Sequence, residues 1–343
     1  MLCKKTMKLE SKHSLKSPLY PLLFDPILKD YLWGGTNIAT VFGKGSGQSC
    51  IAESWEISDR EEGQSVISNG PLAGKTLAHL VKNYNASLFG PGYTFQSFPL
   101  LIKIIDAQKP LSIQVHPTPA ACLSLGGEPK TECWHILECS GQAKVYAGLK
   151  TAMTKQSASL LMQKGEFSSH LHTFEARPSQ TYFIPSGTVH AIGAGCLLFE
   201  VQQNSNTTYR LDDWGRVDKH GKSRELHQEK ALASMAFQNT MAIIQDKITL
   251  APHPYFTRNL LTTNEFFHLE EWSTTKTTPY HYSENQCHIL FCKEGEALLR
   301  SAFGECLIKK GQTVLMPYAS TPTVLKNLGE KLTFLHISLP RNS

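Results

Sequence analysis

The sequence predicts a mainly β protein built from two barrel-like domains, with a small helical insertion in the first domain. Short β-type runs separated by Gly, Pro and Asn turns recur along the chain, which is typical of all-β sandwiches and barrels. The same texture returns after a helical segment near residue 245, so we expect a second β domain there. The length of 343 residues also fits about two domains.

The N-terminal segment 1–18 is expected to be a basic, disordered tail. It contains five lysines and one glutamate and therefore carries most of the formal net charge of +5. The rest of the chain is nearly neutral, which argues against binding of a nucleic-acid backbone. No segment approaches the roughly 20 apolar residues of a membrane span, and the tail lacks the features of an export signal. The nine cysteines are scattered without a C-x-x-C motif, which favours reduced thiols and a cytoplasmic protein.

The first domain, 19–245, is expected to combine β strands with a few helices. Its predicted strands are Leu100–Ile105, Leu111–Val115, Lys144–Leu149, Thr181–Ile184 and Leu197–Gln202. Helices are predicted where apolar residues recur at helical spacing or where Ala, Glu and Gln are frequent: Thr76–Leu88, Lys155–Lys164 and Glu225–Phe237.

The second domain, 246–343, repeats the β texture without a predicted helix. Its expected strands are Cys287–Lys293, Glu296–Ser301, Glu305–Lys309, Thr313–Met316 and Lys331–Ser338. The two domains could be distant copies of one barrel.

A polar strand face gives the first indication of a functional site. In the segment 111–117, LSIQVHP, alternate side chains of a strand share a face, so Ser112, Gln114 and His116 point the same way. Polar residues on a β run suggest that this face has a polar role. The alternative is a histidine that simply satisfies its hydrogen bonds at a strand end.

A second motif supplies another histidine directly after a tight turn. The segment 185–190, PSGTVH, follows a predicted strand, and a P-x-G-x-x-H turn of this kind is used by the metal-binding cupins. Their other motif is H-x-H followed by Glu, and here Gln114 and His116 occupy the H-x-H positions. Glu132 can supply the carboxylate, and His190 completes the set.

This donor set indicates a catalytic metal site. One amide oxygen, one carboxylate and two imidazoles suit zinc, although manganese, cobalt or iron could also fit. The absence of thiolate ligands favours a catalytic over a structural role. We therefore predict a catalytic metal site formed by Gln114, His116, Glu132 and His190.

Together with other segments, these motifs resemble the type I mannose-6-phosphate isomerases, in particular their shorter bacterial form. The matching segments are 32–35 LWGG, 52–58 AESWEIS, 98–103 FPLLIK, 111–117 LSIQVHP, 130–134 KTECW, 184–191 IPSGTVHA and 208–211 TYRL. The resemblance implies two cupin (jelly-roll) barrels and one zinc ion per chain, bound by the same four residues. It also implies that Arg210 is the active-site arginine, with Lys130, Ser112 and Glu200 in the pocket. One departure is Asn206, where many relatives have Asp, so a mechanism that needs that Asp as the base is doubtful here.

The implied reaction interconverts mannose 6-phosphate and fructose 6-phosphate through a cis-enediol, which requires a base and stabilisation of the oxygens. Glu200 is the first candidate for the base and Lys130 the second, although either could be an ordinary surface charge. Arg210 could stabilise the enediolate or hold the phosphate, and Ser112 and Lys130 are further substrate-binding candidates. The alternatives are a non-catalytic sugar-binding cupin and another metal-dependent cupin enzyme, for example an iron dioxygenase.

The C-terminal barrel is expected to bind no metal. At the place of the P-x-G-x-x-H turn it has the segment 317–322, PYASTP, which lacks both Gly and His. His281 and His288 have no H-x-H partner, so the role of this barrel is predicted to be structural. The expected partner is a phosphorylated hexose, and the expected assembly is a monomer or a weak homodimer.

Overall fold

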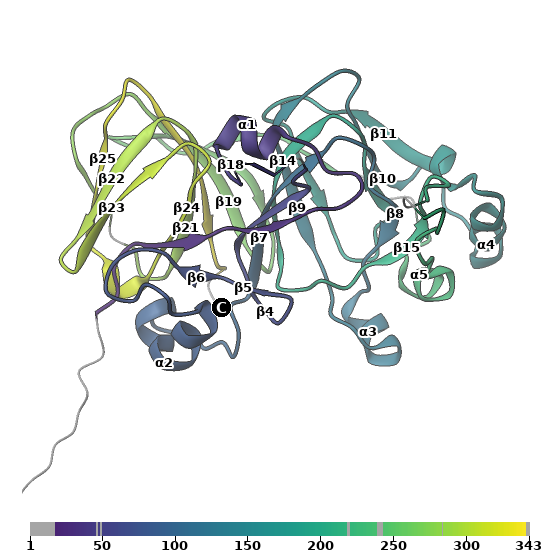
Figure 1. Ribbon diagram of the computed structural model, residues 1–343, viewed down its shortest axis with the longest axis horizontal. Coiled ribbons are helices and arrows are strands. Elements are labelled where there is room, and N and C mark those ends of the chain that lie inside the picture. The colour runs from purple at the N-terminus through teal and green to yellow at the C-terminus, as the bar shows by residue number, and fades with distance from the viewer. Residues whose placement is uncertain are drawn as a thin grey trace, which may run out of the picture.

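The computed structural model describes residues 18–45, 47–48, 50–217, 220–238, 243–282 and 284–340 (Figure 1). The predicted basic tail at 1–18, apart from Pro18, lies outside the described residues. Within the described part, antiparallel sheets dominate, which confirms the mainly β class. No helix of this part has the length and apolar character that a membrane crossing requires.

Two facing sheets form the N-terminal sandwich, drawn mainly in blue and teal in Figure 1. The five-stranded sheet has the order β11 (Leu171–Glu175), β10 (Lys144–Leu149), β13 (His190–Ile192), β8 (Ile113–Val115) and β15 (Tyr209–Asp212). The seven-stranded sheet has the order β16 (Ile244–Gln245), β12 (Thr181–Ile184), β9 (Glu132–Cys139), β14 (Cys196–Gln203), β7 (Leu100–Ala107), β3 (Glu53–Ile57) and β2 (Ile27–Lys29).

Two further sheets form the C-terminal sandwich, drawn mainly in green and yellow. The eight-stranded sheet has the order β17 (Ile248–Thr249), β18 (Thr257–Thr263), β19 (His268–Thr274), β26 (Leu332–Ser338), β21 (His288–Glu294), β24 (Thr313–Met316), β1 (Leu22–Asp25) and β6 (Val66–Ile67). The four-stranded sheet has the order β20 (Tyr280–Tyr282), β25 (Thr323–Asn327), β22 (Glu296–Ser301) and β23 (Gly304–Lys309). A small hairpin pairs β4 (Asp59–Arg60) with β5 (Gly63–Gln64).

The two sandwiches are joined by more than the chain connection near residue 245. Strand β1 pairs with β24, so the N-terminal end of the chain completes a sheet of the C-terminal sandwich. The seven-stranded and eight-stranded sheets also share one core, in which Phe199 stacks on Phe291 with ring centroids 4.5 Å apart. The chain passes from the seven-stranded to the eight-stranded sheet between β16 and β17, but β1 and β6 also belong to the eight-stranded sheet. The domain boundary at residue 245 stays a prediction.

Strand β14 shows how alternation places the site. Leu197, Phe199 and Val201 enter the core between the sandwiches, whereas Leu198 belongs to the core inside the N-terminal sandwich. Because successive side chains of a strand point to opposite faces, Glu200 shares the inward face with Leu198. A charged side chain is thus directed into the N-terminal sandwich.

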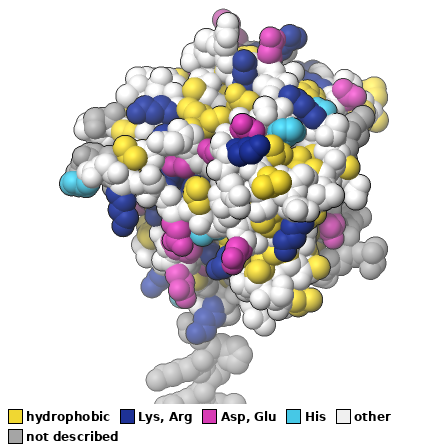
Figure 2. Space-filling view, turned by 90° about the vertical axis from the view of Figure 1, so that its right-hand side faces the viewer, with side chains coloured by type: hydrophobic (Ala, Val, Ile, Leu, Met, Phe, Trp, Pro, Cys, Tyr) yellow, Lys and Arg dark blue, Asp and Glu magenta, His cyan; other side chains and the backbone are white. Residues whose placement is uncertain are grey.

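Within the described residues the helices are α1 (Asn37–Phe42), α2 (Leu77–Phe89), α3 (Pro119–Leu125), α4 (Lys155–Lys164) and α5 (Gln228–Ser234), with 3₁₀ turns at Phe167–His170 and Tyr318–Ser320. Helix α4 confirms its prediction and begins with a capping box formed by Thr154 and Ser157. Apolar side chains of α4 and α5 cover the outer face of the five-stranded sheet. On the molecular face in Figure 2, basic and acidic side chains are interspersed and do not gather into one patch.

The predicted helix at 225–237 is too long, because α5 spans only Gln228–Ser234. His227 pairs with strand β15 instead: its backbone N–H donates to the Arg210 carbonyl, and its Nδ1 accepts from the Arg210 N–H at 3.1 Å. At the other end, Met235 is extended with ψ 145°. The residues before α5 therefore hold the edge strand that carries Arg210.

Candidate active site

Two histidines meet inside the N-terminal sandwich, each fixed by its own backbone contact. His116 follows β8 and its Nδ1 donates to the Thr207 carbonyl at 2.9 Å, while His190 opens β13 and its Nδ1 donates to the Thr188 carbonyl at 2.8 Å. These contacts leave both Nε2 atoms free to act as ligands. Burial lowers the pKa of both imidazoles, to about 3 for His116, where the charge of Lys130 adds to the effect. Both rings are therefore neutral.

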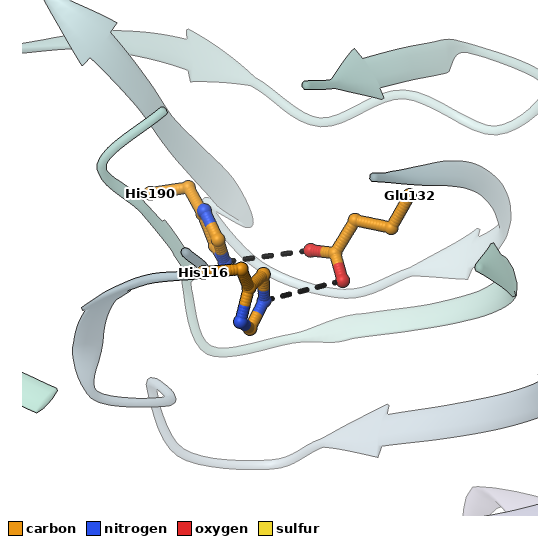
Figure 3. Close-up of side chains that lie close together, drawn as sticks. All are labelled: His116, Glu132 and His190. Carbon is orange, nitrogen blue, oxygen red and sulfur yellow. Dashed lines mark ion pairs between the residues drawn. The ribbon is translucent and has the colours of Figure 1, made fainter. Parts of the chain in front are cut away.

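The Glu132 carboxylate faces both rings from one side, with one oxygen toward each (Figure 3). Its Oε2 is 3.3 Å from His116 Nε2, and its Oε1 is 3.4 Å from His190 Nε2. Lys130 Nζ lies 2.7 Å from the same Oε2. Burial opposes ionisation of Glu132, but the charge of Lys130 is the first of the effects that outweigh burial and hold the pKa of Glu132 well below its usual range. The cluster thus presents an ionised carboxylate and two neutral imidazoles.

Gln114 completes the predicted ligand set, but with its amide turned. Gln114 Nε2 lies 3.3 Å from His190 Nε2, whereas Oε1 accepts a hydrogen bond from the Ser112 hydroxyl at 3.1 Å. The structure therefore directs the amide nitrogen, not the oxygen, toward the cluster. A half-turn of the amide exchanges the two atoms, and Ser112 can then accept from Nε2.

The buried atoms of this cluster fit a metal ion. His116 Nε2 and Glu132 Oε1 make no hydrogen bond although both are buried, and buried polar atoms without partners are uncommon. The ligand atoms of His116, Glu132 and His190 lie within 4.8 Å of one another. Two imidazoles and a carboxylate without a thiolate are a donor set typical of catalytic zinc. Within the described residues, no other group of three His, Cys, Asp or Glu side chains meets the same distance limit.

Arg210 lies in one row with two members of this set. In the five-stranded sheet, His190 is directly across from Gln114, and Gln114 is directly across from Arg210. The Arg210 side chain donates from NH1 to the Glu225 carbonyl at 2.7 Å, while its Nε is buried without a hydrogen bond. Sheet register therefore places Arg210 next to Gln114, and both residues line the same cavity.

Glu200 lies on the seven-stranded sheet in a network of hydrogen bonds and ion pairs. The network includes Lys103 and Glu53, to which the sequence patterns assigned no role. Glu200 Oε1 accepts from Trp134 Nε1 at 3.0 Å, and its Oε2 is 3.3 Å from Lys103 Nζ. Lys103 Nζ is also 3.5 Å from Glu53 Oε2. Burial raises the pKa of Glu200, against the charges of Lys130 and Lys103. Burial opposes the charge of Lys103, but the carboxylates of Glu53 and Glu200 outweigh burial and raise its pKa.

A cavity of about 290 Å³ brings these groups together. Among the predicted site residues it is lined by Ser112, Gln114, Lys130, Glu200 and Arg210. His116, Glu132 and His190 are buried and are not among the residues that line the cavity. The lining residues that the sequence patterns missed include Glu53, Lys103 and Arg224. Lys103 could have been found as a lone cation in an apolar strand, but no pattern in the sequence singles out Arg224.

This chain is similar to a known protein family in both sequence and fold. The family profile for the phosphomannose isomerase type I catalytic domain matches residues 22–126. Mannose-6-phosphate isomerase ManA of Bacillus subtilis strain 168 is 36% identical over 304 residues, which cover 87% of this chain and 93% of ManA. The crystal structure of mannose 6-phosphate isomerase from Bacillus subtilis superposes with a TM-score of 0.85 at 30% identity, covering 94% of this chain and 100% of that one. A zinc-bound mannose 6-phosphate isomerase has the same fold, with a TM-score of 0.75 at 16% identity and coverages of 94% and 100%.

Proposed function

The chain belongs to the type I mannose-6-phosphate isomerases, and on this premise we propose that it interconverts mannose 6-phosphate and fructose 6-phosphate with one bound zinc ion. The observation that carries the proposal is the buried cluster of His116, Glu132 and His190 beside a polar cavity. Its cytoplasmic location, its state of assembly and its lack of nucleic-acid or membrane partners stay predictions from the sequence.

We assign zinc binding to His116 Nε2, His190 Nε2, the Glu132 carboxylate and the Gln114 amide. The two neutral imidazoles and the ionised carboxylate support this assignment, and so does the zinc ion bound by a mannose 6-phosphate isomerase of the same fold. Gln114 would turn its Oε1 toward the ion, because a cation favours the oxygen of an amide. When bound, zinc polarises the sugar oxygens as a Lewis acid.

Glu200 is the residue to which we assign proton transfer between C1 and C2. It lines the cavity, and burial raises its pKa toward the range in which a carboxylate acts well as a base. Trp134 and Lys103 hold its two oxygens, so the carboxylate keeps a fixed direction. Lys130 is the second candidate, but it lies 2.7 Å from Glu132 and neutralises that carboxylate.

Arg210 is assigned to the oxygens of the cis-enediol intermediate. Its position across from Gln114 puts the guanidinium next to the proposed metal site. A fixed cation in a site shielded from water stabilises negative charge that develops during the reaction. Ser112 orients Gln114 through its hydroxyl and lines the same cavity.

The test is a coupled assay of both directions of the reaction with purified protein, before and after treatment with a chelator. We expect interconversion that disappears with the chelator and returns with zinc, and about one zinc per chain by elemental analysis. A protein that binds the sugar phosphate but never turns it over would instead be a sugar-binding cupin. Iron in place of zinc, without isomerase activity, would point to another cupin enzyme.

A further inference from the structure

The charged side chains of the cavity are divided between its two walls. The seven-stranded sheet contributes two carboxylates, Glu53 and Glu200, with Lys103 as the cation that pairs with both. The cation of Lys130 also lines the cavity, but it is paired with the carboxylate of Glu132. The opposite wall contributes the guanidinium groups of Arg210 and Arg224. A phosphate dianion is repelled by the first wall and attracted by the second. The phosphate of a substrate in this cavity therefore faces the arginines.

Arg224 and Arg216 share the carboxylate of Asp213, and Arg210 lies close to this group. Arg224 Nε donates to Asp213 Oδ2 at 2.8 Å, and its NH2 pairs with Asp213 Oδ1, which also pairs with Arg216 NH2. Arg216 is turned away, since its NH1 donates to the Pro110 carbonyl at 2.5 Å. The charges of Arg224 and Arg216 contribute to a lowered pKa of Arg210, behind burial as the first cause. Asp213 can neutralise only one of the two guanidinium groups that it binds, so positive charge remains on this wall beside Arg210.

The two arginines of the wall lie at different depths. Arg210 is across from Gln114 in the sheet, next to the proposed zinc ligands. Arg224 lines both the cavity and an adjoining surface hollow, as does Tyr31, and the Arg224 side chain is 30% exposed. Arg224 is therefore at the mouth of the cavity.

We propose that Arg224 binds the phosphate of the substrate and thereby selects hexose 6-phosphates over free hexoses. This assignment rests on the proposed function, which puts C1 and C2 near Arg210 and Glu200. The phosphate is at the other end of the six-carbon chain, which directs it toward the mouth. Asp213 holds the Nε edge of Arg224 and so fixes the guanidinium before the substrate arrives. A fixed guanidinium is well suited to phosphate oxygens.

The experiment compares zinc-loaded wild type with Arg224→Gln and Arg224→Lys. Calorimetry measures the Kd for mannitol 1-phosphate, which has a terminal phosphate but no carbonyl, and the assay gives kcat and KM for mannose 6-phosphate. We expect Arg224→Gln to raise Kd and KM at least about 10-fold, as the loss of a hydrogen bond between charged groups does. The kcat should stay within about 2-fold, because an anchor that binds ground state and transition state equally does not change the chemical step. Arg224→Lys, which keeps the charge, should lose less.

Arg216→Gln is the matched control, because it also removes an arginine from Asp213 but does not touch the cavity. Its Kd for mannitol 1-phosphate should stay within about 2-fold of wild type, and unphosphorylated mannitol should not distinguish any of the variants. The proposal is wrong if Arg224→Gln binds mannitol 1-phosphate as wild type does, or if only kcat falls. If wild type does not convert mannose 6-phosphate, the proposed function is wrong. The Kd values of wild type and Arg224→Gln for mannitol 1-phosphate still decide whether Arg224 binds the phosphate.

Discussion

The two sandwiches contain similar groups in their interiors but arrange them differently. Each has a buried histidine pair: the ring centroids of His116 and His190 are 4.8 Å apart, and those of His288 and His336 are 4.6 Å apart. Each also has one arginine with a buried Nε that makes no hydrogen bond, Arg210 in the first and Arg258 in the second. A close histidine pair is therefore not sufficient evidence of a metal site.

The difference lies in the groups around each pair. His116 and His190 donate from Nδ1 to backbone carbonyls and face the carboxylate of Glu132. In the C-terminal sandwich, His336 Nε2 contacts the Tyr282 hydroxyl at 2.9 Å, and neither nitrogen of His288 makes a hydrogen bond. The ligand atoms of His116, His190 and Glu132 all lie within 4.8 Å of one another. Within the described residues, no carboxylate lies as close to His288 and His336. We therefore propose that the C-terminal sandwich binds no metal.

The interiors also differ in how much space they leave. In the C-terminal sandwich, Trp272, Phe334 and Phe256 pack against one another, and Arg258 lies over the Trp272 ring at 5.5 Å. In the N-terminal sandwich, the inward row of the large sheet includes Glu200 and Lys103, and a cavity remains beside them. Aromatic side chains pack together in one interior, whereas a network of charges lines a cavity in the other.

The strongest test of this comparison removes one histidine from each pair. His116→Ala or His190→Ala should lose the bound zinc and reduce isomerase activity to background, because each removes a ligand. His288→Ala, combined with His281→Ala, should keep about one zinc per chain and nearly full activity. Elemental analysis and the coupled assay measure both effects. A drop of metal content to half in the second variant would mean that both sandwiches bind metal.

The second test compares the two arginines. Arg210→Ala should lower kcat by roughly 10²–10³-fold with unchanged zinc content, because it removes a charge that stabilises the transition state. Arg258→Ala removes the arginine of the C-terminal sandwich whose Nε is likewise buried without a hydrogen bond, and it should leave kcat and KM unchanged. A rise in KM alone for Arg210→Ala would instead assign this residue to ground-state binding.

The third test concerns stability of the charged interior. Lys103→Met removes the cation between two buried carboxylates and should destabilise the protein by about 3–5 kcal/mol in a denaturant titration. Lys310→Met is the control, since this exposed lysine is 3.8 Å from Glu138 and its loss should change stability by less than about 1 kcal/mol. Equal effects of the two substitutions would contradict the assignment of a buried charge network.

The smallest expected effect is a pH dependence that originates in the C-terminal sandwich. Burial lowers the pKa of His288 to about 3, whereas the same residue in the unfolded chain titrates near pH 6.5. The unfolded state therefore takes up a proton first as the pH falls, and stability is lost from about pH 6.5 downward. Between pH 7 and pH 5 this residue should account for about 2 kcal/mol, so His288→Leu should lose correspondingly less stability than wild type over that interval. An identical pH profile for both proteins would show that His288 does not stay neutral in the folded state.

Much of the local structure followed from sequence patterns alone. The strands at Lys144–Leu149 and Thr181–Ile184 and the helix at Lys155–Lys164 have the predicted bounds, because alternation, turns and caps are local signals. The helix before residue 237 was predicted too long, because its first residues bond to β15, a contact with no local signal. The pairing of β1 with β24 could not be predicted either, because no pattern in either segment indicates which strand it pairs with.

The sequence by itself determined which donor types the chain offers, since spacing on a strand and a P-x-G-x-x-H turn are properties of short segments. It was enough to name Gln114, His116, Glu132 and His190 as a set. Only the tertiary structure decided that Lys103 pairs with two buried carboxylates. It also decided that Asp213 binds Arg224 and holds it at the mouth of the cavity. These contacts join residues from different strands and loops, and their energies depend on burial and distance, which arise only when the sheets face each other.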